Sequence, residues 1–198
     1  MPRSAFSICV YCGSRGGNDP RFVDAARAVG QWIGEAGGQL VYGGGRAGLM
    51  GAVADATQAA GGRVVGIIPQ SLVDREAANR ACDELRVVST MHERKAMLAE
   101  RSDAFLALPG GIGTFEELFE AWTWRQLGYH DKPLGMLNVA GYYDGMLNFL
   151  QHAVDSGFMG QPTAQLLQVG TDVRSLLDSL AAGAVGNRGD VVPPSSVI

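Results

Sequence analysis

The chain has 198 residues, of which 46% are hydrophobic and 28 are glycine, and this composition fits one compact domain with a full core. Its formal charge is -4 and its basic residues are scattered, so there is no electrostatic reason to expect a nucleic-acid or membrane-surface partner. The first residues show no basic leader or cleavage site, and no apolar run approaches the ~18 residues of a membrane span. A cytoplasmic location is therefore expected.

Short β-branched runs alternate with longer helical patterns along the chain. Strands are predicted at Phe6–Cys12, Gln39–Tyr42, Val64–Ile68, Leu85–Val88, Ala104–Leu108, Leu134–Leu137 and Leu166–Val169. Helices are predicted near Pro20–Glu35, Gly48–Ala60, Met91–Arg101, Thr114–Gln126, Tyr143–Ser156 and Asp172–Ala182. Such alternation is typical of a mostly parallel sheet with helices on both faces. We therefore expect a single α/β, Rossmann-like domain over residues 1–182 and a flexible tail over 183–198.

Cysteine and histidine spacing does not indicate a metal or redox site. Cys9 and Cys12 lie three residues apart near the first predicted strand, so their side chains should face opposite sides of the sheet. We expect ordinary buried thiols there. His92, His130 and His152 show no ligand spacing with carboxylates or cysteines and are expected to be surface or capping residues.

The run from Tyr42 to Gly48 contains G-x-G-x-x-G between a predicted strand and a predicted helix. A dinucleotide site also needs an acidic residue at the end of the next strand, where this chain has Pro69-Gln70-Ser71. A nicotinamide or flavin cofactor is therefore disfavoured. The glycines let the backbone approach a smaller nucleotide or form a tight turn. The polar connection Pro69–Glu84 is longer than most and is a candidate substrate loop.

The cluster Met91-His92-Glu93-Arg94-Lys95 opens a helix just before the strand Ala104–Leu108. Cations in a first helical turn oppose the helix dipole, and a bound anion would remove that penalty. Anion binding by Arg94 and Lys95 and a simple role as solvated surface side chains are equal alternatives at this point.

The most informative stretch, Leu106–Glu120, is an apolar strand followed by a glycine turn and an acidic helix start. Glycines 110, 111 and 113 keep side chains away from the backbone, and the helix N-terminus offers N–H groups to an anion. This pattern predicts a phosphate cradle. Glu117 would lie within one turn of that anion, which suggests chemistry on a phosphorylated ligand. The alternative is a capping box, with Thr114 as N-cap and Glu117 as its partner.

The residues from Pro109 to Glu117 match the P-G-G-x-G-T-x-x-E signature of the Lonely Guy family, and Arg94-Lys95 matches the R-K pair upstream of it. The resemblance extends from Tyr11-Cys12-Gly13-Ser14 through Tyr42-Gly43-Gly44-Gly45 to about residue 180. These proteins are cytokinin-activating phosphoribohydrolases with a Rossmann-like fold and usually form dimers. The resemblance implies hydrolysis of the N-glycosidic bond of an adenine-type nucleoside 5′-monophosphate, and a homodimer is expected.

The resemblance also implies roles for individual residues. Arg94 and Glu117 would be catalytic. Substrate contacts are expected from Gly13, Ser14, Gly44, Gly45, Glu76, Lys95, Gly111, Ile112, Gly113, Thr114, Phe115, Glu116 and Thr123. Neither a cofactor nor a metal is expected, because the charge that develops in this reaction is positive. The sequence leaves open whether the substrate is AMP or a prenylated adenylate.

Two other interpretations remain from the sequence. A nucleotide-sensing module would hold the phosphate without breaking a bond, although it would not need Glu117. The other is a dinucleotide oxidoreductase, which Pro69-Gln70 disfavours. The lysine decarboxylase label that many family members once carried fails on chemistry, because such an enzyme would need a Schiff-base lysine in a pyridoxal pocket. The lysines here are Lys95, within the anion cluster, and Lys132, before Pro133.

Overall fold

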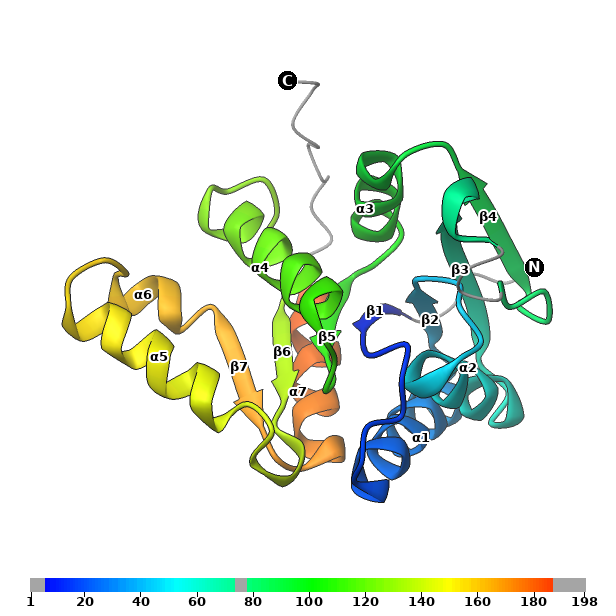
Figure 1. The fold of residues 1–198 in the computed structure, drawn as a ribbon, viewed down its shortest axis with the longest axis horizontal. Coiled ribbons are helices and arrows are strands. Elements are labelled where there is room, and N and C mark those ends of the chain that lie inside the picture. Colours follow the sequence, from blue (N-terminus) through cyan, green and yellow to red (C-terminus); the bar gives the residue numbers. More distant parts are fainter. Residues whose placement is uncertain (1–5, 74–77, 187–198) are drawn as a thin grey trace.

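The protein forms one twisted parallel sheet with helices on both faces (Figure 1), in a computed structural model that describes residues 6–73 and 78–186. The strand order is β4-β3-β2-β1-β5-β6-β7, and every strand pairing within the described residues is parallel. The strands are β1 (Ser7–Tyr11), β2 (Gln39–Tyr42), β3 (Arg63–Pro69), β4 (Glu84–Val88), β5 (Ala104–Ala107), β6 (Leu134–Leu137) and β7 (Leu167–Gly170). The predicted α/β class and its seven strands are confirmed.

The helices agree with the prediction apart from small differences at their ends and one short helix, Gln161–Ala164, that was not predicted. They are α1 (Pro20–Glu35), α2 (Gly48–Ala59), α3 (Met91–Glu100), α4 (Ile112–Gln126), α5 (Asp144–Asp155), the short α6 (Gln161–Ala164) and α7 (Val173–Gly186), with 3-10 turns η1 (Gln70–Leu72) and η2 (Val139–Gly141). Helix α7 runs four residues beyond the predicted end at residue 182. The division into a domain and a flexible tail remains a prediction, because residues 187–198 lie outside the described part. No helix among the described residues is both long and apolar enough to cross a membrane.

Successive side chains along a strand point to opposite faces of the sheet and pack into two hydrophobic cores, one on each face. Ile8 and Val10 of β1 pack into the core that α1, α2 and α7 cover. Cys9 and Tyr11 pack into the core beneath α3, α4 and α5. Both faces are apolar because a parallel sheet is covered on both sides.

The cysteine prediction is confirmed by these cores. Cys9 belongs to one core and Cys12 to the other, and both are buried free thiols. Burial raises the pKa of both thiols, and the charge of Glu117 raises it further. Both therefore stay protonated at neutral pH.

The expectation for the histidines is wrong for His130, which is buried, whereas His92 and His152 are exposed. The Nε2–H of His130 donates to the Ala121 carbonyl at 3.0 Å, while its Nδ1 accepts from the backbone N–H of Lys132 at 3.2 Å. Burial lowers the pKa of His130 to about 4. This neutral ring ties α4 to the segment that leads into β6.

The strand order reverses between β1 and β5, and this places the candidate site. Strands β1 to β4 succeed one another toward one edge, and the chain then returns to pair β5 with β1 (Figure 1). The loops after β1 and β5 consequently diverge on opposite sides of the sheet and leave a crevice at their carboxyl ends.

Candidate functional site

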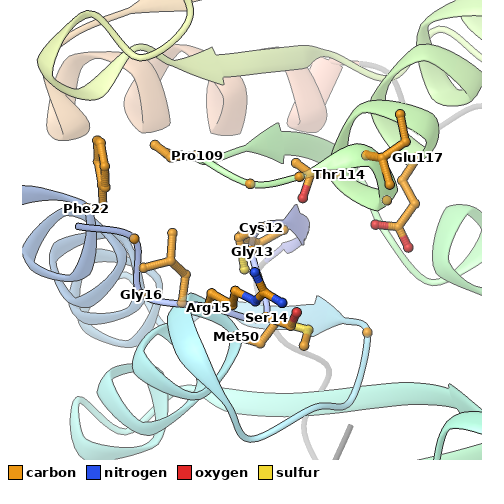
Figure 2. Close-up of a pocket in the computed structure, with 18 of the residues that line it drawn as sticks. Cys12, Gly13, Ser14, Arg15, Gly16, Phe22, Met50, Pro109, Thr114 and Glu117 are labelled. Carbon is orange, nitrogen blue, oxygen red and sulfur yellow. The ribbon is translucent and has the colours of Figure 1, made fainter. Parts of the chain in front are cut away.

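A cavity of about 490 Å³ lies at this reversal of the strand order. Its walls come from the β1–α1 loop, the glycine turn after β5, the start of α2, and side chains from α1, α3, α4 and the turn after η2. Figure 2 shows part of this lining. The lining residues are Val10, Cys12, Gly13, Ser14, Arg15, Gly16, Gly17, Asn18, Phe22, Gly43, Leu49, Met50, Arg94, Pro109, Gly110, Gly111, Ile112, Gly113, Thr114, Glu117 and Tyr142. The volume falls in the range of small-molecule sites.

The glycine turn is held tightly against the β1–α1 loop. The Gly13 N–H donates to the Pro109 carbonyl at 3.0 Å. A Cβ on Gly110 would lie 2.1 Å from Oγ1 of Thr114 and 2.9 Å from the Gly13 nitrogen, so a side chain cannot fit there. By contrast, Cβ atoms on Gly111 and Gly113 would meet none of the described atoms within 4 Å. These two glycines therefore leave open space for a ligand beside the backbone.

Helix α4 starts earlier than predicted, and this overturns the capping-box alternative. The N-cap is Gly111, and within the described chain no side chain caps this end. Thr114 is the third residue of the helix, so it cannot serve as the N-cap that the capping box requires. The N–H groups of the first turn have no intrahelical acceptors, and the helix dipole makes this end attractive to an anion.

Arg94 is a buried cation with few good hydrogen bonds. Its side chain is 7% exposed, and its Nη2 lies 3.6 Å from Oε1 of Glu117. The same Nη2 lies 3.5 Å from the Gly43 carbonyl, and Nη1 lies 3.8 Å from the Met91 sulfur. Its buried Nε has no hydrogen-bond partner among the described residues. A buried guanidinium held this loosely has donors left for a ligand.

Glu117 faces Arg94 from the first turns of α4. Its side chain is 12% exposed, and Figure 2 shows it at the end of the cavity beside Thr114. The separation from Arg94 exceeds a normal hydrogen bond. The two opposite charges therefore border the same space.

Lys95 points away from this space and ties α3 to α4. Its Nζ lies 2.6 Å from Glu116 and 2.9 Å from Glu120, and its side chain is 12% exposed. Burial lowers the pKa of Lys95, but the hydrogen bonds to the two carboxylates outweigh burial and raise it above the ordinary value. These ion pairs join α3 next to Arg94 to α4 near Glu117.

The structure brings many of the expected site residues together. Those that line the cavity are Gly13, Ser14, Arg94, Gly111, Ile112, Gly113, Thr114 and Glu117. Outside its lining are Gly44, Gly45, Lys95, Phe115, Glu116 and Thr123. Glu76 lies outside the described residues. The long connection after β3 approaches the glycines, because Ala78 forms a bridge with Gly45.

Several lining residues were not expected from the sequence. Arg15 adjoins the predicted pair Gly13-Ser14, and only that adjacency could have suggested it. Tyr142 comes from the distant turn after β6, where its hydroxyl donates to the Gly110 carbonyl. Its ring meets Phe22 edge to face at a centroid distance of 5.6 Å. No spacing in the sequence signals this aromatic pair.

The G-x-G-x-x-G run has packing reasons for its glycines. Nη2 of Arg94 occupies the space where a Cβ of Gly43 would stand, at 2.2 Å. Gly48 has a φ of 59°, and its Cβ would lie 2.4 Å from the Arg15 nitrogen. The run thus brings the β1–α1 loop and Arg94 close to the backbone.

Comparisons with known proteins identify relatives of this chain. The family described as "possible lysine decarboxylase" matches residues 50–180. A cytokinin riboside 5′-monophosphate phosphoribohydrolase of Arabidopsis thaliana is 47% identical over 87% of this chain and 81% of the relative. An enzyme of the same name from Oryza sativa subsp. japonica is 49% identical over 88% of this chain and 73% of its own length.

Solved structures share the fold at much lower identity. A molybdenum cofactor binding protein from Rippkaea orientalis superposes with a TM-score of 0.69 at 21% identity, over 92% of this chain and 98% of that one. DNA processing protein A from Helicobacter pylori superposes with a TM-score of 0.55 at 12% identity, over 90% of this chain and 81% of that one. At these identities the likeness establishes the fold and nothing further.

Proposed function

The chain belongs to the Lonely Guy family, and from this premise we propose that it hydrolyses the N-glycosidic bond of a cytokinin riboside 5′-monophosphate. The products would be the free adenine-type base and ribose 5-phosphate. The observation that carries the proposal is the pair Arg94 and Glu117, 3.6 Å apart and beside an open glycine turn at a helix N-terminus. The names of the relatives supply the substrate class.

The phosphate would sit at the start of α4. Ile112, Gly113 and Thr114 offer first-turn N–H groups, and the open side of Gly111 and Gly113 leaves room for the anion. The Thr114 hydroxyl would add a further hydrogen bond. With the phosphate anchored there, the ribose is directed toward Glu117, one turn further along the helix.

Glu117 would act on the sugar. Departure of the base leaves positive charge on the ribose ring, and a nearby carboxylate stabilises that charge. The same carboxylate can accept a proton from the water that attacks the anomeric carbon, while the bonding electron pair leaves with the base. The base takes up a proton from solvent as it leaves, and Glu117 returns its proton to solvent. Removal of this acid–base role reduces rates by about 10²- to 10⁴-fold in enzymes generally.

Arg94 would hold the substrate in line for this attack. Its guanidinium has unused donors in a buried position, and their fixed fork geometry suits a phosphate or a pair of ribose hydroxyls. Its neighbour Glu117 keeps the guanidinium near the reacting carbon. Alignment of this kind can contribute several kcal/mol, about 7 at the low end of measured intramolecular cases.

Lysine decarboxylation, named in the family description, has no support in the site. A pyridoxal enzyme needs an accessible lysine in the cofactor pocket. Lys95 is engaged by two carboxylates, and Lys132 is buried with its Nζ 2.6 Å from the Ala99 carbonyl. Neither lysine lines the cavity.

The proposal extends to a homodimer and a cytoplasmic location. Phe119, Leu127 and Tyr129, on and after α4, expose 37%, 59% and 36% of their surface, and such side chains support an interface between two copies. Light scattering on the wild type and on Phe119→Arg tests the dimer. The cytoplasmic location stays a prediction from the sequence.

The reaction itself is tested by incubating the purified protein with isopentenyladenosine 5′-monophosphate, with AMP, and with the nucleoside isopentenyladenosine, and following free base by chromatography. Release from a nucleotide but little from the nucleoside is expected, because the site is built around the phosphate. The ratio of kcat/KM for the two nucleotides then decides between the prenylated substrate and AMP. Binding without base release from either nucleotide would contradict the hydrolase and support a sensing module.

A further inference from the structure

The negative charge of a bound nucleotide is not neutralised by Arg94 and the start of α4 alone, so a second cation is needed. A phosphate monoester carries about -1.5 to -2 at pH 7. Glu117 adds another negative charge to the same space, while Arg94 supplies one positive charge. The start of α4 contributes about half a charge more. These groups alone leave an excess of negative charge when the substrate is bound.

Lys95, the cation expected from the resemblance to contact substrate, does not restore this balance. It lies outside the cavity lining and is already matched by Glu116 and Glu120. Among the described residues that line the cavity, the charged side chains are Arg15, Arg94 and Glu117. Arg15 is therefore the second cation available to the ligand.

The β1–α1 loop places Arg15 firmly. Gly13, two residues before it, is hydrogen-bonded to Pro109, and its Cβ position lies 3.3 Å from the Gly110 Cα. On its other side the loop backbone at Arg15 packs against Gly48 at the start of α2. Figure 2 shows the Arg15 side chain extending from this loop toward the middle of the cavity, near Ser14 and Met50.

Arg15 also differs from the next arginines along the chain. Arg21 pairs with Asp19 at 2.5 Å, and Arg27 pairs with Asp24 at 3.4 Å. The Arg15 side chain forms neither a hydrogen bond nor an ion pair within residues 6–73 and 78–186. Arg15 is exposed, so the donors of its guanidinium are accessible to an anion.

We propose that Arg15 is a substrate-binding residue that contacts the 5′-phosphate from the side opposite the start of α4. This inference rests on the proposed function and adds to it a determinant of selectivity for nucleotides over nucleosides. The planar guanidinium suits bidentate contact with phosphate oxygens. Arg15 would act in binding and leave the bond-breaking step to Glu117 and Arg94.

The test compares Arg15→Ala and Arg15→Lys with the wild type. Loss of one charged contact to phosphate should raise KM for isopentenyladenosine 5′-monophosphate by about 10- to 100-fold, with kcat changed less than about twofold. Arg15→Lys should recover part of the loss, because the charge remains but the fork geometry does not. Arg27→Ala, which removes an equal charge from an exposed position on α1, is the matched control and should change neither KM nor kcat.

Calorimetry with ribose 5-phosphate separates this inference from the proposed reaction. Arg15→Ala should weaken binding of ribose 5-phosphate by the same factor as KM, and binding of ribose should not change. An Arg15→Ala protein with wild-type affinity for ribose 5-phosphate, or with reduced kcat at unchanged KM, would overturn the phosphate contact. Wild-type protein that binds ribose 5-phosphate through Arg15 but releases no base would leave Arg15 in place and refute the hydrolase.

Discussion

Gly43→Ala should displace the proposed catalytic arginine without disturbing the fold. A Cβ at this position would lie 2.2 Å from Nη2 of Arg94, where ordinary contacts are 3.4 to 4 Å, so the guanidinium must retreat by about 1 Å or more. The φ of Gly43 lies outside the left-handed region, so alanine is compatible with the backbone. The other contacts, Arg94 Cζ at 3.4 Å and Met50 Sδ at 3.5 Å, are ordinary.

A misplacement of this size reduces catalysis by about 100-fold. We therefore expect kcat/KM for the nucleotide to fall by about that factor, while the melting temperature changes little. Gly145→Ala is the matched control, because the added Cβ meets none of the described atoms within 4 Å.

A double-mutant cycle shows whether Gly43 acts through Arg94. In an Arg94→Ala background the added methyl group has nothing to displace, so Gly43→Ala should have no further effect. Near wild-type kcat/KM for Gly43→Ala, or an equal loss in both backgrounds, would refute the reasoning.

Three further predictions concern the scaffold. Lys95→Met should lower stability by about 1 kcal/mol in denaturant unfolding, since its ion pairs tie α3 to α4. Burial gives His130 a pKa of about 4 in the folded protein, against about 6.5 in the unfolded chain. As the pH falls from 6.5 to 4 the unfolded chain binds the proton first, so the free energy of unfolding decreases by on the order of 3 kcal/mol. His130→Gln should make the free energy of unfolding less dependent on pH in this range. Gly30→Ala should destabilise by about 1 to 3 kcal/mol in thermal melts, because its Cβ would lie 2.4 Å from the Val53 carbonyl oxygen.

The sequence predicts the sheet well because most of its strands are short apolar runs between glycine or polar turns. β2 and β6 begin and end at the predicted residues. Buried strands of a parallel sheet carry their signal locally, in residues that are apolar on both faces. The position of the site follows from the alternation of strands and helices along the chain, because the glycine turns after parallel strands meet at one edge of the sheet.

Side-chain partners are harder to predict, because they depend on contacts between distant segments. The T-x-x-E pattern at Thr114 satisfies a capping box, but α4 begins at Ile112. Lys95 is adjacent to Arg94 in sequence, yet the packing of α3 on α4 turns it toward Glu116. Tyr142 joins the site through a turn that precedes α5, and nothing in its local sequence indicates Gly110 as its partner.

The central claim, that Glu117 performs the chemistry, is tested most directly by measuring kcat of Glu117→Gln on isopentenyladenosine 5′-monophosphate, with ribose 5-phosphate affinity as a check on the site. Glu116→Gln, at the adjacent exposed position, is the matched control. We expect Glu117→Gln to retain its affinity and to lose turnover by about 10²- to 10⁴-fold, with Glu116→Gln close to the wild type. Near-normal turnover by Glu117→Gln would contradict the mechanism.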